Sequence, residues 1–278
     1  MARALEGEGG DVEVVPIPTR DGGRREPGDK SRFVREIEEA LLKGEVELAV
    51  HSAKDLPGDL PDGLEIVGAP PAEDARDALA GAVASIDDLP EGARVGTSSL
   101  RRRSQLLAIR PDLDVRELHG NVDTRLSKLR EGDWAAIVLA LAGLRRLGRE
   151  EQAAYVFPAG EFVPASGQGI LALEARSGDA AAKEAAAGIS DDLALRRLRA
   201  ERAFVSTLDT SCRTPVGSHA SIDGGELGVQ GYAGLPDGSE WIRDEVRGPD
   251  GPEELGRLLA ERMLSAGAGD LLRRAEGM

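Results

Sequence analysis

One short pattern is repeated three times between residues 93 and 148, and it constrains the fold more than any other feature. In each copy an apolar run leads, directly or through a short polar turn, into a helical pattern whose first turns contain arginine. The runs are ARVG (93–96), DVRELHG (114–120) and AAIVLA (135–140); the helical patterns are LRRRSQLLAIR (100–110), TRLSKLREG (124–132) and LAGLRRLG (141–148). Strands that alternate with helices predict a parallel sheet in an α/β fold.

These strand-to-helix junctions are suited to binding anions. A helix N-terminus offers free N–H groups and the positive end of the helix dipole, and arginine binds carboxylates with two parallel hydrogen bonds. Residues 94–149 contain twelve Lys/Arg against six Asp/Glu, although the net charge of the chain is −15. One arginine cluster alone is more simply a solvated helix face. Three clusters at corresponding junctions favour an anion-binding site.

Composition narrows the class of protein. No run of eighteen apolar residues and no apolar signal segment occurs, so we expect a cytoplasmic protein without a membrane partner. Aromatic residues make up 3% and the net charge is −15, which argues against nucleic-acid binding. The single cysteine excludes an intrachain disulfide, and three scattered histidines show no metal-ligand spacing, so no metal is expected.

The remaining elements extend the α/β pattern. A Gly-rich turn leads into an apolar strand at 164–176, which could re-enter the sheet of the first domain, and 70–78 is suited to an interdomain crossing. We also expect strands at 11–17, 46–52 and 64–70, a helix at 31–44 closed by Gly44, a helix at 190–208 with Asp191 or Asp192 near its start, a meander of short strands, and a final helix at 252–267.

Two short segments contain candidate chemical groups. HSAKDLP (51–57) follows a predicted strand, where open α/β sheets place their sites, but Lys54 and Asp55 could equally form a surface ion pair. Cys212 lies in the turn TSCRTP. A lone cysteine is most often a small buried hydrophobe, whereas an exposed one beside Arg213 would favour the thiolate. The residues alone leave both alternatives open.

Six motifs occur in an order that resembles the porphobilinogen deaminase (hydroxymethylbilane synthase) family. They are HSAKDLP, GTSSLRRRSQL, HGNVDTRLSKL, LAGLRRLG, PASGQGI and ERAFVSTLDTSCRTPVGSHA, and the resemblance runs to about residue 235. It implies two α/β domains of the type II periplasmic-binding-protein kind and a small C-terminal α+β domain. The corresponding boundaries are 1–72 with 167–188 for domain 1, 73–166 for domain 2 and 189–278 for domain 3.

The resemblance also implies an enzyme, a transferase of haem and tetrapyrrole biosynthesis that joins four porphobilinogen units with loss of ammonia. A dipyrromethane cofactor would be attached through Cys212, Asp55 would be the catalytic aspartate and Lys54 its neighbour. Matches to residues that contact cofactor and substrate are Arg101, Arg102, Arg125, Arg146, Lys30, Ser99 and His119. By analogy with the family, the protein would act as a monomer.

Two departures from the family pattern bear on activity. The family opens with a strand that contains Arg-x-Ser, and this chain begins with MARALEGEG, so we expect an N-terminal truncation. His119 stands where the family usually has arginine, and a largely uncharged histidine weakens one carboxylate contact. The alternatives to an active deaminase are a non-catalytic anion-binding module and an inactive paralogue. A binding module would need neither Cys212 nor Asp55, so their joint presence favours the enzyme.

Overall fold

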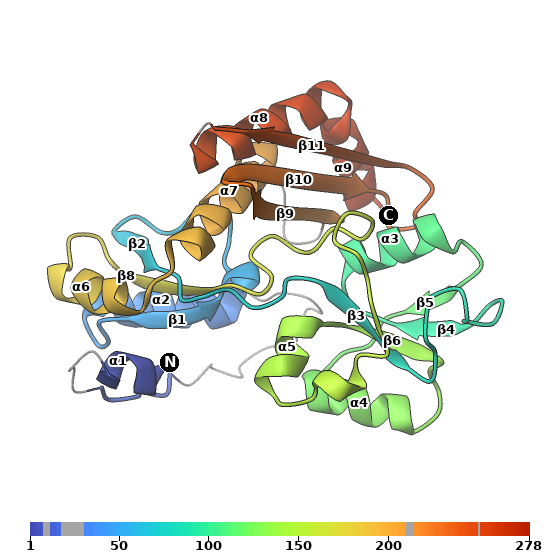
Figure 1. The fold of residues 1–278 in the computed structure, drawn as a ribbon, viewed down its shortest axis with the longest axis horizontal. Helices are drawn as coiled ribbons and strands as arrows, with labels where there is room; N and C mark the ends of the chain where they lie inside the picture. Colours follow the sequence, from blue (N-terminus) through green and yellow to red (C-terminus); the bar gives the residue numbers. More distant parts are fainter. Residues whose placement is uncertain (8–11, 18–30, 210–213, 250) are drawn as a thin grey trace.

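The structure is a computed structural model that describes residues 1–7, 12–17, 31–209, 214–249 and 251–278. Three sheets organise these residues (Figure 1). The first and second sheets lie side by side, the third lies above them, and the long helix α7 (Asp192–Leu208) runs from the first sheet to the third. Within this part of the chain, no helix combines the length and apolar composition needed to span a bilayer.

The first sheet combines segments that are far apart in sequence. Its order is β1-β8-β2, and β8 is antiparallel to both neighbours. The predicted return of the Gly-rich segment to this sheet is therefore confirmed. The elements are β1 (Ala49–Ser52), the 3-10 turn η1 (Ala53–Asp55), β2 (Leu64–Gly68), β8 (Leu171–Arg176), and the helices α1 (Ala2–Gly7), α2 (Ser31–Lys43) and α6 (Ala180–Ile189).

Helix α2 shows how its sequence sets its end. Its apolar side contributes Leu41 to a small core with Ala49 and Leu64 of the sheet. The helix ends at Lys43, and Gly44 follows with φ +71°, in the left-handed region that lets the chain turn away. The predicted closure by Gly44 is confirmed.

The second sheet contains the three repeated units. Its order is β5-β4-β6-β3-β7; β4 is parallel to β5 and to β6, as the repeat predicts, while β3 is antiparallel to β6 and β7. The elements are β3 (Asp77–Gly81), β4 (Arg94–Gly96), α3 (Leu100–Ile109), β5 (Asp114–Arg116), α4 (Val122–Arg130), β6 (Ala136–Ala140), α5 (Leu141–Arg146), the 3-10 turn η2 (Glu150–Gln152) and β7 (Tyr155–Val156).

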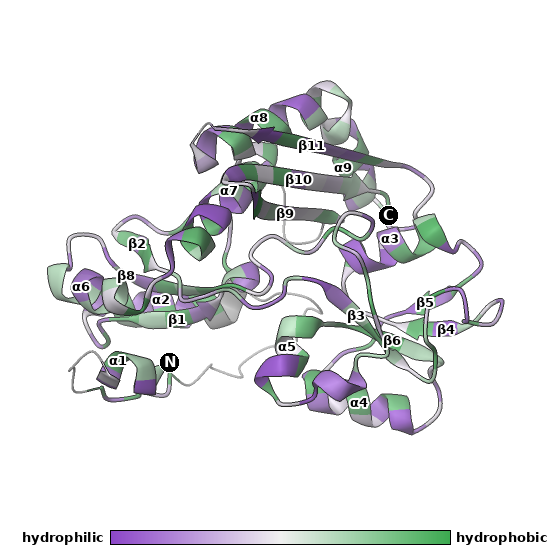
Figure 2. Cartoon of the chain, in the orientation of Figure 1, coloured by the Kyte–Doolittle hydropathy of each residue, from purple (hydrophilic) through white to green (hydrophobic). Residues whose placement is uncertain are grey.

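Strand β6 is buried on both faces of this sheet. Val138 packs with Leu106 of α3 on one face, while Ile137 packs with Leu126 of α4 and Leu144 of α5 on the other. Successive side chains of a strand point to opposite faces, so a strand with a core on each side must be apolar throughout. In Figure 2, β6 has hydrophobic colour along its length, whereas α4 alternates between polar and apolar residues.

The third sheet is the predicted meander. Its order is β11-β10-β9, and all pairs are antiparallel. Phe204 of α7 packs in its core with Val229, Leu259 and Met263. The remaining elements are β9 (Val216–Asp223), β10 (Glu226–Gly234), β11 (Trp241–Gly248), α8 (Pro252–Ser265) and α9 (Ala268–Glu276). The expected fold class, α/β with a small C-terminal α+β part, is thereby confirmed.

One predicted strand is wrong. Residues 12–17, within the predicted strand 11–17, form neither strand nor helix, and Val14 and Val15 are exposed. A strand requires a neighbour to complete its hydrogen bonds, and among the described residues no strand pairs with this segment. The predicted domain boundaries stay a prediction, although the strands of each sheet come from the segments assigned to each domain.

Candidate functional site

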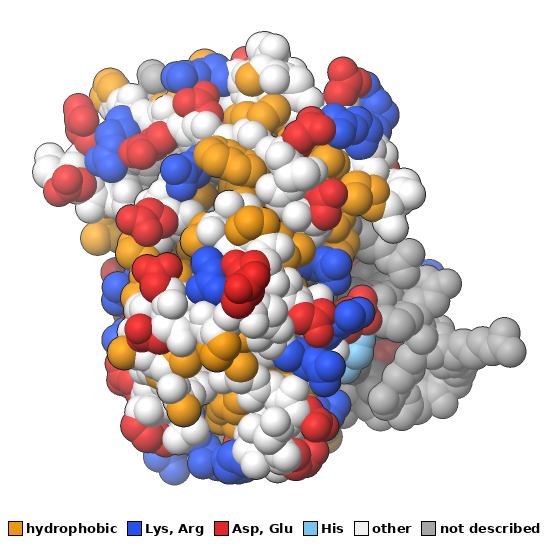
Figure 3. Space-filling view, turned by 90° about the vertical axis from the view of Figure 1, so that its right-hand side faces the viewer, with side chains coloured by type: hydrophobic (Ala, Val, Ile, Leu, Met, Phe, Trp, Pro, Cys, Tyr) orange, Lys and Arg blue, Asp and Glu red, His pale blue; other side chains and the backbone are white. Residues whose placement is uncertain are grey.

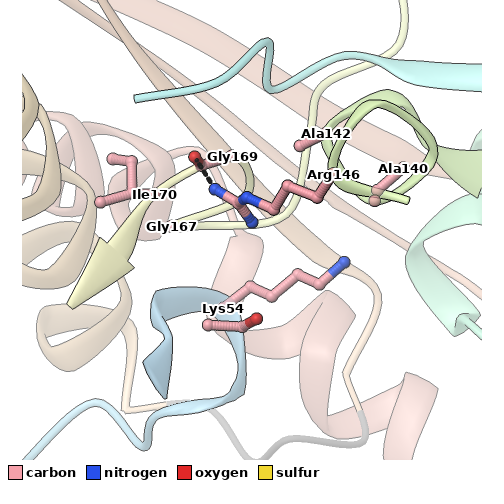
Figure 4. Close-up of a pocket in the computed structure, with 9 residues that line it drawn as sticks. Lys54, Ala140, Ala142, Arg146, Gly167, Gly169 and Ile170 are labelled. Atoms are coloured by element: carbon pink, nitrogen blue, oxygen red, sulfur yellow. Dashed lines mark hydrogen bonds between the residues drawn. The ribbon is translucent and has the colours of Figure 1, made fainter. Parts of the chain in front are cut away.

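A pocket of about 70 Å³ lies where three segments meet (Figure 4). One segment is the end of β1 with η1, the second is the junction between β6 and α5, and the third is the Gly-rich loop before β8. The pocket therefore combines the first sheet, the second sheet and a segment that connects them. The lining residues are Ser52, Lys54, Ala140, Ala142, Gly143, Arg146, Gly167, Gly169 and Ile170.

Lys54 and Asp55 are placed by the turn η1. The turn follows β1 directly, and the Ala53 N–H donates a 3.0 Å hydrogen bond to the carbonyl of Ile170. Lys54 extends into the pocket and donates to Gln168 Oε1 at 3.4 Å (Figure 4). Asp55 is half-buried at the end of the same turn. The predicted pair thus lies at the carboxyl end of a strand.

Arg146 reaches the pocket from the opposite wall (Figure 4). Its guanidinium donates a 2.8 Å hydrogen bond to the carbonyl of Gly169. Partial burial lowers the pKa of the guanidinium from its usual value, and the negative charge of Glu73 acts in the opposite direction. Lys54 and Arg146 therefore present two positive charges, from different sheets, to one small cavity.

The predicted pair Arg101 and Arg102 lies deeper than a solvated helix face. Their side chains are 4% and 7% exposed, and both bind Asp77, which is completely buried. Arg101 donates to Asp77 Oδ2 at 2.8 Å, and Arg102 donates to Oδ1 at 2.7 Å. Burial alone would raise the pKa of the Asp77 carboxyl, but the two arginines outweigh it and lower the pKa to about 2. Two cations and one anion leave this cluster with a net positive charge.

Gln168 joins this cluster to the pocket. Its amide nitrogen donates to Ala75 O at 2.6 Å and to Asp77 Oδ1 at 2.9 Å. Its amide oxygen accepts from Lys54 at 3.4 Å and from Arg102 at 3.5 Å. A single buried side chain therefore contacts both the pocket lysine and the arginine–aspartate cluster.

Arg125, on α4, approaches the same cluster. It donates to Ser98 Oγ at 3.1 Å, while its Nε is buried without a hydrogen-bond partner. Burial, and then the charge of Arg102, lower the pKa of its guanidinium from the usual value. A cationic donor that is desolvated but unsatisfied is costly unless a ligand completes it.

The other predicted residues are placed differently. The Ser99 side chain caps α3 and accepts the Arg102 N–H at 3.4 Å. His119 is half exposed, and its Nε2 lies 3.0 Å from Glu117 Oε2, so the structure does not bring it to the pocket lining. Lys30 and Cys212 lie outside the described residues.

The basic excess of 94–149 does not form a uniformly basic surface. Much of it is neutralised by ion pairs, such as Arg110 with Asp112, Arg116 with Asp114 and Arg149 with Asp123. On the face shown in Figure 3, acidic and basic side chains are interspersed. Arg125 and Arg146, by contrast, hydrogen-bond neutral oxygens and make no ion pair with a carboxylate among the described residues.

Three polar residues around this site were not predicted from the sequence: Asp77, Gln168 and Glu201 of α7. Glu201 had a signal, because it falls on the helical stripe Ala194, Leu198, Phe204 and Leu208, which is otherwise apolar and buried. A charged residue on such a stripe indicates a buried polar contact. Gln168 lies within the quoted motif PASGQGI, but nothing local indicates its distant partners.

The chain is similar to known proteins in sequence and in structure. A curated porphobilinogen deaminase from Campylobacter concisus is 44% identical over 255 residues, which cover 90% of this chain and 82% of that protein. Among solved structures, a nutrient-binding protein from Burkholderia cenocepacia bound to methionine has a TM-score of 0.42 at 13% identity, covering 73% of this chain and 87% of that chain. The second substrate-binding domain of a putative amino acid ABC transporter from Streptococcus pneumoniae has a TM-score of 0.41 at 15% identity, covering 67% of this chain and 78% of that chain. Neither structural similarity bears on function.

Two protein-family models match successive parts of the chain. Residues 3–184 match "Porphobilinogen deaminase, dipyromethane cofactor binding domain", and residues 195–265 match "Porphobilinogen deaminase, C-terminal domain". Together they span all three sheets of the structure. The chain therefore belongs to the porphobilinogen deaminase family.

Proposed function

We propose that this chain joins four porphobilinogen units into a linear tetrapyrrole, with one ammonia lost per unit, and releases the product as hydroxymethylbilane by addition of water. We propose that the pocket at Lys54 and Arg146 is its reaction site. The observation that carries the proposal is that these two cations, from different sheets, line one cavity beside Asp55. Porphobilinogen has two carboxylates, so a growing chain becomes strongly anionic and requires several cationic contacts.

The arginines divide into two groups in this proposal. Arg125 and Arg146 bind carboxylates of the ligand directly, since their described hydrogen bonds go only to neutral oxygens. Arg101 and Arg102 are bound to Asp77 and supply net positive charge from beneath the site. Direct contacts from Arg101, Arg102, Ser99, Lys30 and His119 stay predictions.

Asp55 is the proposed catalytic carboxylate. Loss of ammonia from porphobilinogen places positive charge on the pyrrole nitrogen, and a carboxylate within hydrogen-bond reach of that N–H stabilises the charge. Asp55 lies at the end of η1, next to the lysine that enters the pocket. Lys54 orients an anionic substituent of the substrate beside it.

The residues present fit a dipyrromethane. The fit rests on the unsatisfied buried Nε of Arg125, together with the donors of Arg146 and Lys54, because these groups suit the carboxylates of such a cofactor. Cys212 would hold the group covalently, and Arg125, Arg146 and Lys54 would bind its acidic substituents. When bound, dipyrromethane supplies the free pyrrole carbon to which the first substrate unit is added.

The finer parts of the proposal are a cytoplasmic location, a monomeric state, and the absence of nucleic-acid and membrane partners. The net charge of −15 supports the last of these, because it repels anionic polymers and anionic lipid surfaces. The location and the monomeric state are proposed by analogy with the family.

Intact-protein mass spectrometry tests the proposal. Protein from cells that make porphobilinogen should exceed its sequence mass by one dipyrromethane, react with Ehrlich's reagent and form bilane. Cys212→Ala should show the bare sequence mass and no colour. A wild-type chain at its bare mass that neither colours nor forms bilane would instead indicate an anion-binding module.

A further inference from the structure

Glu201 is a buried acid that the proposed chemistry does not use. It lies on α7, its side chain is 1% exposed, and its neighbours along the buried stripe of the helix are apolar. A carboxylate in such a position is costly unless hydrogen bonds satisfy both of its oxygens.

Both oxygens of Glu201 accept backbone hydrogen bonds, from two different parts of the molecule. Oε2 accepts the N–H of Gly167 at 2.5 Å, and Oε1 accepts the N–H of Ala220 at 2.7 Å. Ala220 lies in β9 of the third sheet, whereas Gly167 lies in the loop that lines the pocket. One carboxylate thus ties α7 to the third sheet and to the loop. Beside it, Ser166 Oγ and Ser218 Oγ are 2.5 Å apart and join the same two segments.

The two residues that follow Gly167 hold the two cations of the pocket. Gln168 accepts a hydrogen bond from Lys54, and the carbonyl of Gly169 accepts one from Arg146. The loop also has little freedom toward η1, because a Cβ built on Gly167 would lie 2.9 Å from the Lys54 backbone nitrogen. A shift of Gly167 would therefore be transmitted to both cations.

We infer that Glu201 is a positioning residue: by fixing Gly167, its carboxylate sets the spacing of Lys54 and Arg146 for the carboxylates of porphobilinogen. The third sheet, from which Cys212 is four residues distant in sequence, thereby controls the geometry of a pocket built from the other two sheets. This inference rests on the proposed function, because it assigns the pocket cations to the substrate.

The experiment compares two variants that place methionine on the same helix, Glu201→Met and Arg197→Met. Arg197 donates to the carbonyl of Ala220 at 2.8 Å, so both variants lose a bond between α7 and Ala220, but only Glu201→Met loses the bond to Gly167. KM and kcat for porphobilinogen are measured on cofactor-loaded protein, with loading checked by intact mass and folding by thermal unfolding.

Glu201→Met should raise KM about tenfold while kcat falls less, because a hydrogen bond to a charged group contributes on the order of a tenfold affinity factor or more. Arg197→Met should keep KM within about twofold of wild type. An unchanged KM in Glu201→Met, or an equal rise in Arg197→Met, would overturn the inference, while a wild-type chain that forms no bilane would overturn the proposed function instead.

If Glu201→Met does not fold, Ser166→Ala replaces it. That variant removes only the hydroxyl contact to Ser218, next to Gly167, and should raise KM about two- to threefold, as expected for one neutral hydrogen bond. A KM equal to that of wild type would then count against the inference.

Discussion

Arg102 donates two hydrogen bonds to a single oxygen of Asp77, from Nε at 3.0 Å and from a terminal nitrogen at 2.7 Å. The pair connects the start of β3 to the first turn of α3 inside the protein, where Asp77 is completely buried and Arg102 is only 6% exposed. Removal of one partner would leave buried charge uncompensated.

Asp77→Asn should accordingly lower the free energy of unfolding by about 3–5 kcal/mol, the cost typical of breaking one side of a buried ion pair. Denaturant unfolding measures it. Asp244→Asn is the matched control, because Asp244 pairs with Arg262 at a partly exposed site and should cost at most about 1 kcal/mol. If both variants lost a similar free energy of unfolding, burial would not make the Asp77 ion pair more important for stability than the partly exposed pair.

Gly167→Ala tests the close approach of the pocket loop to η1. Gly167 has φ +72°, and an added Cβ would lie 2.8 Å from the carbonyl carbon of Ala53. Gly92 has φ +70° but open space around its Cβ position. In both alanine variants, backbone strain should lower the free energy of unfolding by about 1–2 kcal/mol. Only Gly167→Ala should lose further stability, because its added Cβ overlaps the backbone of Ala53. Its Tm should therefore be lower than that of Gly92→Ala. Equal Tm values for the two variants would refute the close approach.

Asp55→Asn should lower kcat about a hundredfold or more with little change in fold, because it removes the charge that stabilises the pyrrolic cation. Asp59→Asn is the control, since Asp59 lies four residues later in the same loop, is exposed and contacts Ser206. Its kcat should stay within about twofold of wild type. Bilane formation measures both. Wild-type turnover by Asp55→Asn would remove Asp55 from the chemistry.

Stability should depend on pH through Glu201. Burial raises the pKa of its carboxyl to about 7, despite the hydrogen bonds from Ala220 and Gly167 and the charge of Arg197. The folded state then holds the proton more tightly than the unfolded state, so the contribution is present below about pH 4.5 and is lost as the pH rises through 7. Wild type relative to Glu201→Gln should therefore lose about 3 kcal/mol between pH 4.5 and 8.

The neighbours of Glu201 should not mask this trend. His219 faces it at 3.8 Å, but burial, with Arg197, lowers the pKa of His219 to about 4, so its ring stays neutral through most of this range. Both groups are present in wild type and in Glu201→Gln, so the difference between the two unfolding curves isolates Glu201. A difference that is constant with pH would contradict the raised pKa.

Helices and strands could be predicted from the sequence where the interactions that determine them are local. The parallel β5-β4-β6 unit, the closure of α2 by Gly44 and the capping of α7 by Asp191, one of the two aspartates predicted near its start, each follow from a periodicity or a cap within a few residues. The sequence patterns did not lead us to predict the helices α6 and α9. The predicted strand that includes residues 12–17 was wrong, because a strand depends on a partner strand elsewhere in the chain.

The candidate site divides in the same way. Their place at a strand end made Lys54 and Asp55 candidates, and the family resemblance assigned their roles and added Arg146; the structure brings Lys54 and Arg146 to one pocket. The roles of Asp77 and Gln168 could not be predicted, because the ion pair of Asp77 with Arg101 spans 24 residues and the contact of Gln168 with Lys54 spans 114. No spacing rule reaches that far along a chain.

The position of β8 between β1 and β2 has a consequence for how the chain folds. The strands of the second sheet all lie between residues 77 and 156, so that sheet can form as soon as this stretch has left the ribosome. Strands β1 and β2 have no ladder between them and must wait for Arg176, more than a hundred residues later. Such long loops slow the search for native pairing. The middle of this protein is thus free to fold first, while β1 and β2, which are synthesised earlier, join their sheet late and leave their edges unpaired until then.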